Sequence, residues 1–174
     1  MKPHAFLFLA LGVLLAGCGD AVVVQCPSAA VLSDTSVLTV FRAGAPHDLS
    51  GEAYTAGIGN VRTDCSYPRG ATASISTLAF TVRAIRAPSP DGATYTLPYY
   101  LATIQGERIL TKQPLTVEVS FAPGSASASQ EVSMSDLEVS LEPGHPPTDY
   151  QFLVGFQLSD AERAYNATRG RFSP

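Results

Sequence analysis

The most regular feature of the chain is an alternation of hydrophobic and polar residues, the pattern of a β-strand with one buried face. In the clearest segment Leu115, Val117, Val119 and Phe121 alternate with polar residues. The same period predicts buried faces in three further strands: Leu78, Phe80, Val82 and Ala84 within Thr72–Arg86; Tyr95, Leu97, Tyr99 and Leu101 within Thr94–Gln105; and Tyr150, Phe152, Val154, Phe156 and Leu158 in the last strand.

Several positions interrupt this alternation. The phase changes between Ile75 and Leu78, which predicts a bend in that strand. A one-residue slip near Asp136 predicts a β-bulge. Gly57 and Gly59, within a loosely alternating segment, predict either a bulge or a close approach of another backbone.

The two ends of this β-rich region have other patterns. Ala21–Gln25 is β-branched and predicts an early strand, whereas Ser33–Phe41 fits either a short helical turn or a strand. Near the C-terminus Ser159 and Glu162 have the spacing of a capping box, which predicts a helix over Asp160–Thr168. About eight short strands and one terminal helix predict an all-β fold, an antiparallel immunoglobulin- or fibronectin-like β-sandwich whose strand order stays open.

The first eighteen residues follow a different pattern. A short basic start precedes the apolar run Ala5–Leu15, which is too short to span a bilayer and has the length of a signal-peptide core. Leu15–Cys18, with the sequence Leu-Ala-Gly-Cys, resembles the lipobox of bacterial lipoproteins. The resemblance implies that residues 1–17 are a cleaved signal and that Cys18 is lipidated. Several acyl chains on one cysteine anchor a protein stably.

The residues after Cys18 bear on where the anchored protein resides. In enteric lipoproteins an Asp directly after the cysteine implies retention in the inner membrane, whereas here Gly19 intervenes before Asp20. This favours the outer membrane, on its periplasmic face. Residues 18–20 form a short tether before a single domain at 21–174. Cys18 and Cys26 can be separated by at most about 25–30 Å, so we expect the domain close to the membrane, with partners at or near it.

Composition limits the possible partners. Removing residues 1–17 leaves 157 of the 174 residues, enough for one domain with its own core. Lys2 would be removed with the signal, so the mature chain would keep 10 of the 11 Lys and Arg residues and all 15 Asp and Glu residues. This acidic balance argues against nucleic acid as a partner. Cys26 and Cys65 are the remaining cysteines, and in an oxidising compartment they predict a disulfide worth about 3–4 kcal/mol.

Candidate catalytic chemistry is sparse. His47 and His145 lie in predicted loops, and neither has a partner at metal-ligand spacing. The sequence predicts no catalytic residue, cofactor or metal, and no evident small-molecule ligand. Of three clustered tyrosines, Tyr95 and Tyr99 share a face with hydrophobic residues and are expected to pack, while Tyr100 is the better candidate for an exposed binding residue.

Several segments together resemble a group of small, uncharacterised lipoproteins of Gram-negative bacteria. The resemblance covers most of the mature chain and rests on these residues: Cys26-Pro27, Val31–Asp34, Leu38–Arg42, Cys65–Tyr67, Leu153–Leu158 and Tyr165-Asn166. It implies the compartment and a single domain, but no activity and no site.

The sequence thus predicts a non-enzymatic envelope lipoprotein, bound to the membrane by its lipid, that acts as an accessory or adaptor for an envelope protein partner or binds a ligand. The alternative is a periplasmic hydrolase or cell-wall-modifying enzyme with a site built from loops. That alternative requires His47 or His145 to lie beside a carboxylate and a serine in one cleft. A purely structural surface protein is the third possibility.

Overall fold

Residues 25–67 and 70–169 are described by a computed structural model of the chain. They form eight strands, two short 3-10 helices and one α-helix. In chain order these are β1 (Ser28–Val31), η1 (Ser33–Thr35), β2 (Val37–Phe41), β3 (Glu52–Ser66), β4 (Ala73–Arg86), β5 (Ala93–Gln105), β6 (Arg108–Phe121), β7 (Ser127–Ser140), η2 (Pro147–Asp149), β8 (Tyr150–Phe156) and α1 (Asp160–Arg169).

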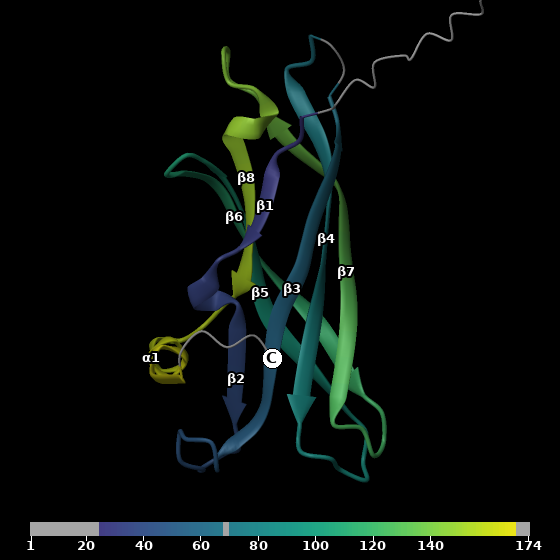
Figure 1. Cartoon of the computed structure of the whole chain (residues 1–174), viewed down its shortest axis with the longest axis vertical. Helices are drawn as coiled ribbons and strands as arrows, with labels where there is room; N and C mark the ends of the chain where they lie inside the picture. The colour runs from purple at the N-terminus through teal and green to yellow at the C-terminus, as the bar shows by residue number, and fades with distance from the viewer. Residues whose placement is uncertain (1–24, 68–69, 170–174) are drawn as a thin grey trace, which may run out of the picture.

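The strands form two four-stranded sheets that pack face to face, with orders β1-β8-β5-β6 and β2-β3-β4-β7 (Figure 1). The predicted sandwich is therefore present, but the prediction of wholly antiparallel sheets is wrong at one pair, because β1 runs parallel to β8. Parallel strands need a long connection, and β1 and β8 are joined by almost the whole described chain. Hydrophobic alternation reports which face of a strand is buried and carries no information on the direction of its neighbour.

The hydrophobic core lies between the two sheets. The alternation predicted most of its members correctly. These predicted residues are buried: Leu78, Phe80, Val82, Ala84, Leu97, Tyr99, Leu101, Val117, Val119, Phe121, Tyr150, Phe152, Val154 and Phe156. Burying a side chain of this size stabilises a fold by about 1.5–3 kcal/mol.

Strand β4 also buries two residues that hydrophobicity did not predict. Ser74 and Ser76 are at most 1% exposed, and their hydroxyls have no hydrogen-bond partner among the groups described. Ile75, between them, is 38% exposed. The inward face of β4 therefore continues through the serines without a change of phase. The irregularity lies in the neighbouring strand β7, where the register shifts and Asp136 has a φ of 57°, as the predicted bulge requires.

Strand β3, which contains Gly57 and Gly59, has a bulge, one of the two alternatives that these glycines predicted. Its register with β4 shifts between Gly59 and Arg62, and Asn60 between them has a φ of 53°. Of the two alternatives for Ser33–Phe41, the strand is confirmed over Val37–Phe41, and the helical turn is limited to η1 at Ser33–Thr35. The strand predicted at Ala21–Gln25 lies outside the described residues, apart from Gln25.

The predicted disulfide is present. Cys26 and Cys65 are joined by an S–S bond of 2.08 Å, with their Cα atoms 5.5 Å apart. Cys26 precedes β1 in one sheet, and Cys65 lies near the end of β3 in the other sheet. The bond therefore links the two sheets at one end of the sandwich.

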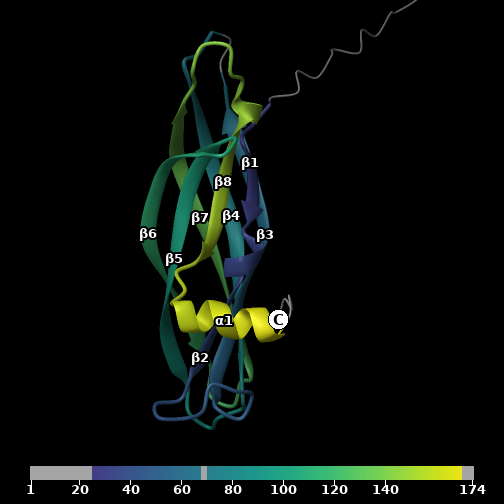
Figure 2. The ribbon, with the colours of Figure 1, turned by 90° about the vertical axis from the view of Figure 1, so that its left-hand side faces the viewer.

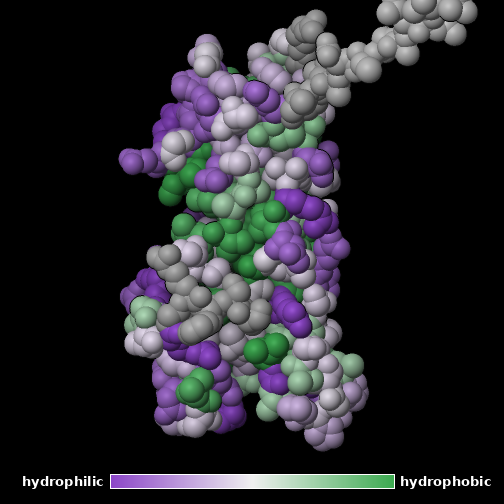
Figure 3. All heavy atoms as spheres, in the orientation of Figure 1, coloured by the Kyte–Doolittle hydropathy of each residue, from purple (hydrophilic) through white to green (hydrophobic). Residues whose placement is uncertain are grey.

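The predicted capping box begins α1. The backbone N–H of Ser159 donates to Glu162 Oε2 at 2.6 Å, and the N–H of Glu162 donates to Ser159 Oγ at 3.3 Å. The helix lies across the direction of the strands, beside β2 (Figure 2). None of its residues is buried. Figure 3 shows that hydrophobic residues gather in the middle of one face of the molecule, whereas hydrophilic residues are more frequent toward both ends.

Candidate functional site

A pocket of about 870 Å³ lies between α1, η1 and the adjoining ends of β2, β3 and β4. Its hydrophobic lining includes Val37, Leu49, Ala53, Ile85 and Ala167. Leu49 is 71% exposed and Ile85 is 42% exposed, which is unusual for large hydrophobic side chains that border one hollow. The volume lies within the usual range of about 300–1,000 Å³ for small-molecule sites.

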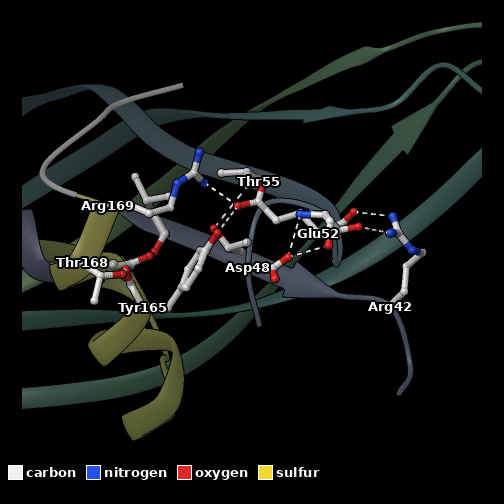
Figure 4. Close-up of polar contacts among 11 residues, drawn as sticks. Arg42, Asp48, Glu52, Thr55, Tyr165, Thr168 and Arg169 are labelled. Atoms are coloured by element: carbon white, nitrogen blue, oxygen red, sulfur yellow. Dashed lines mark hydrogen bonds and ion pairs between the residues drawn. The ribbon is translucent and has the colours of Figure 1, made fainter. Parts of the chain in front are cut away.

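A carboxylate in this pocket holds the helix in place. Tyr165 and Arg169 of α1 are both directed at Glu52 (Figure 4). The Tyr165 hydroxyl donates to Glu52 Oε1 at 2.5 Å, and Arg169 Nη1 donates to the same oxygen at 2.7 Å. Partial burial and the bond to Glu52 raise the pKa of Tyr165 above its ordinary value. A further bond, 2.8 Å from Asn166 Nδ2 to the Val37 carbonyl, attaches α1 to β2.

Arg42 lines the pocket where β2 ends. Its guanidinium donates to the backbone carbonyls of Ser50 and Glu52, the latter at 2.8 Å (Figure 4). Asp48 in the same loop accepts bonds from the N–H and hydroxyl of Ser50, at 2.8 Å and 2.6 Å, which lower the pKa of Asp48. Arg42 forms no ion pair within residues 25–67 and 70–169, so its hydrogen bonds there go to neutral backbone acceptors.

Arg86 lines the pocket where β4 ends and is bound in a similar way. It donates to the carbonyl of Asp91 at 2.7 Å and to that of Ser125 at 3.4 Å. Its guanidinium carbon lies 4.6 Å from the centre of the Phe121 ring, a cation–π contact. In the described part of the chain it too has no carboxylate partner.

A smaller hollow of about 510 Å³ adjoins the pocket and brings His47, Asp48 and Ser50 together. These are the residue types that the hydrolase alternative requires in one cleft. However, the Ser50 hydroxyl is bonded to Asp48, and the His47 ring stacks on Phe41 with centroids 4.4 Å apart. No hydrogen bond among the described residues connects His47 to the serine.

His145 lies away from this pocket, in the loop before η2. Its Nδ1 shares a hydrogen bond of 2.8 Å with Asp149 Oδ2, and both side chains are roughly half exposed. This histidine has the carboxylate that the hydrolase alternative requires. No serine hydroxyl is hydrogen-bonded to either residue in the described structure.

The three tyrosines of β5 have separate surroundings. Tyr95 and Tyr99 pack as predicted, with ring centroids 4.2 Å from Tyr54 and 5.4 Å from Phe80 respectively. The prediction that Tyr100 is exposed is wrong, since it is 6% exposed.

Tyr100 is covered from two directions on the outer face of β5. Its hydroxyl shares a 2.9 Å hydrogen bond with Thr35 of η1, and Lys112 Nζ lies 4.4 Å from its ring centre. The alternation of β5 could not reveal this cover, because it comes from a 3-10 turn distant in the chain.

The described residues offer neither a metal site nor a membrane-spanning helix. Residues 25–67 and 70–169 contain no group of three or more His, Cys, Asp or Glu side chains placed to hold a metal ion. None of the helices in the same residues has the length and hydropathy needed to cross a membrane. Cys18, the predicted lipidation site, lies outside the described residues.

Comparisons with protein-family models, with curated proteins and with solved structures find no match to this chain. The predicted kinship with small envelope lipoproteins therefore stays a prediction. The pocket itself was not predicted, because its lining comes from six separate segments of the chain. Leu49, a large hydrophobic residue in a loop rich in turn residues, is a sequence signal that could have pointed to it.

The Glu52 contacts lead to a prediction about the helix. Replacing Glu52 with glutamine removes the charge that Arg169 pairs with, and charged hydrogen bonds contribute about 1.5–3 kcal/mol. We expect the amides of α1 to exchange with deuterium roughly tenfold faster or more, while the amides of β4 and β5 keep their rates. Native-state hydrogen exchange measures both.

The matched control is Glu131→Gln, which breaks the exposed ion pair with Arg62. Exposed pairs contribute about 0–1 kcal/mol, so this variant should leave α1 unchanged. Equal exchange rates of α1 in the Glu52→Gln variant and the wild type would show that the helix is held by other contacts.

Proposed function

We propose that the chain is a lipid-anchored protein of the bacterial envelope whose β-sandwich binds a ligand in the pocket beside α1. The observation that carries the binding role is the pocket itself, which combines exposed Leu49 and Ile85 with two arginines, Arg42 and Arg86, that lack a described carboxylate partner. The lipobox ending at Cys18 supports the anchor. The disulfide supports an oxidising compartment outside the cytoplasm.

The proposed site lies far from the proposed anchor. β3 runs from Glu52, at the pocket, to the region of Cys65, at the disulfide, and the two lie toward opposite ends of the long axis (Figure 1). Thirteen residue steps of a strand cover about 40 Å. With a short tether before Cys26, the pocket is expected to face the aqueous periplasm, so its ligand arrives from solution and not from the bilayer.

A binding role is preferred to hydrolysis because of the hydrogen bonds at the smaller hollow. The Ser50 hydroxyl is engaged by Asp48, and His47 is stacked on Phe41. The role as an adaptor for an envelope protein remains compatible with the same pocket, if the ligand recognised there is part of that protein.

We also propose that the sandwich has an immunoglobulin- or fibronectin-like architecture. Two four-stranded sheets and a disulfide between them support this proposal, whereas the parallel pair of β1 and β8 and the absence of Trp depart from immunoglobulin domains. An experimental structure in which the sheets cross at nearly right angles, and not at about 30°, would contradict it.

Anchoring is tested by metabolic labelling with palmitate. The wild type should incorporate label and fractionate with membranes, and the Cys18→Ala variant should do neither, because the sulfur that carries the lipid is missing. Sucrose-gradient fractionation then separates outer from inner membrane, with the outer membrane expected. Equal labelling of both proteins would disprove the anchor.

Binding is tested with the full chain carrying Cys18→Ala, so that no detergent is needed. A small-molecule library that includes anions, cations and neutral compounds is screened by NMR. Binders should shift the signals of Ala53 and Ile85. The variant Ala167→Trp, which puts a large ring into the pocket lining, should abolish those shifts. Ala161→Trp, an exposed position of α1 outside the lining, is the control. A library in which no compound of any charge binds would refute the binding role.

A further inference from the structure

We infer that the pocket selects an anionic small molecule, with a carboxylate or phosphate group that binds Arg42 and Arg86 and an apolar portion that covers Leu49 and Ile85. The inference rests on the proposed binding function and names the chemical class of its ligand. It is carried by the charge of the lining, by the unused donors of two arginines and by the position of the exposed hydrophobic side chains.

The pocket is positive within an acidic chain. The whole chain has a formal net charge of −4, yet the pocket is lined by four arginines and only two carboxylates. Two of these arginines are neutralised, Arg169 by Glu52 and Arg163 by Asp160. Arg42 and Arg86 are not, as far as the described residues extend, and the second lining carboxylate, Asp34, offsets only one of them, so the lining keeps a net positive charge. A positive hollow on a negative protein attracts anions and repels cations.

Both arginines have guanidinium N–H donors that make no hydrogen bond to the described residues. A guanidinium carries five N–H donors in a planar fork. Arg42 and Arg86 each use two of them in bonds to backbone carbonyls, which are neutral acceptors. These carbonyl bonds also fix each guanidinium in place, so that little side-chain freedom is lost on binding. A fixed guanidinium with spare donors suits the paired oxygens of a carboxylate or phosphate.

The two arginines lie on either side of β3. Arg42 is bonded through its backbone N–H to Gly51, and Arg86 is paired in register with Tyr54. From the spacing of strands and residues, their Cα atoms are roughly 10–15 Å apart, so both residues can border one ligand in the pocket. Ile85 directly precedes Arg86, so their side chains leave β4 on opposite faces, and both border the pocket where the strand ends.

The size of the pocket indicates the size of the ligand. A volume of about 870 Å³ accommodates a small molecule and is too small for a folded partner. The hydrophobic lining requires an apolar portion, because Leu49 would otherwise remain largely exposed to water. The structure therefore assigns the pocket to amphipathic anions.

The test uses four probes with the same six-carbon chain: hexanoate, hexyl phosphate, hexylammonium and 1-hexanol. Each is titrated by NMR into the full chain carrying Cys18→Ala. Hexanoate, hexyl phosphate or both should bind at least tenfold more tightly than 1-hexanol, and hexylammonium should bind least. The ratio of the two anions identifies the preferred head group. Raising the salt concentration should weaken binding, because Arg42 is exposed and its charge is screened.

Variants of the two arginines test whether these side chains bind the anionic probes. Arg42→Gln and Arg86→Gln should each weaken binding of the preferred anion at least fivefold, with no change for 1-hexanol. Arg42→Lys, which keeps the charge but loses the fork, should give an intermediate loss. Arg83→Gln is the control, since Arg83 is an exposed arginine of β4 outside the pocket lining. Circular dichroism and a thermal melt establish that each variant is folded.

The outcomes separate this inference from the binding function. If 1-hexanol and hexanoate bind equally, or if the Arg42 and Arg86 variants bind anions as the wild type does, the choice of anions is wrong while the pocket remains a binding site. If neither these probes nor any library compound shifts the pocket signals, the binding function itself fails.

Discussion

An alanine at position 155 is expected to lower the free energy of unfolding by about 3 kcal/mol. Gly155 lies in β8 beneath the contact between Thr35 and Tyr100, and a Cβ there would be 2.0 Å from Thr35 Oγ1 and 2.7 Å from the Tyr100 hydroxyl. Overpacking of this kind typically costs about 1–3 kcal/mol, and here it also breaks a part-buried hydrogen bond. Urea unfolding monitored by circular dichroism measures the change.

Gly59→Ala is the matched control for this glycine. Gly59 also lies in a strand, and its added Cβ would have no atom within 4 Å. We expect its stability to stay within about 0.5 kcal/mol of the wild type or to rise slightly. Adding Thr35→Ala to the Gly155→Ala variant should recover part of the loss. A Gly155→Ala protein as stable as the wild type would mean that η1 does not pack over β8 as described.

The second large effect is expected from removing the disulfide. Replacing both Cys26 and Cys65 with alanine should lower the free energy of unfolding by about 4 kcal/mol, because a cross-link over a separation of 39 residues restricts the unfolded chain. Urea unfolding under oxidising conditions measures the difference.

The wild type treated with a reducing agent should match the double variant. If both lose less than about 1 kcal/mol, the bond adds little to stability, and its role is then limited to joining the sheets. A loss seen only in the variant would instead point to packing defects at the two alanine positions.

The sequence predicted the buried faces because each depends on a local property. The alternation in β5, β6 and β8 is strong enough that one face is hydrophobic whatever it packs against. The capping box of α1 is likewise local, since Ser159 and Glu162 satisfy each other's backbone. The disulfide could be predicted because only two cysteines were left to pair in an oxidising compartment.

The errors have a common physical origin in contacts between distant segments. Ser76 is buried and Ile75 is exposed because β4 keeps its pleat, and the pleat, not the hydropathy of one residue, decides which side chain faces inward. Tyr100 is covered by Thr35, which lies 65 residues away in the chain. The pocket arises in the same way, from loops and strand ends whose polar residues show no periodic pattern.

The position of the Cys26–Cys65 bond has a mechanical consequence for a protein held by its N-terminus. A pull transmitted from a lipid on Cys18 would enter the fold at Cys26, next to β1, a strand of four residues at the edge of its sheet. Without the bond, that force would act first on β1 and its four residue pairs with β8. The bond would pass part of the load to Cys65 near the end of β3, a strand of 15 residues that pairs with β4 along most of its length. A lipid on Cys18 would therefore pull on both sheets together, with the pocket near the other end of β3.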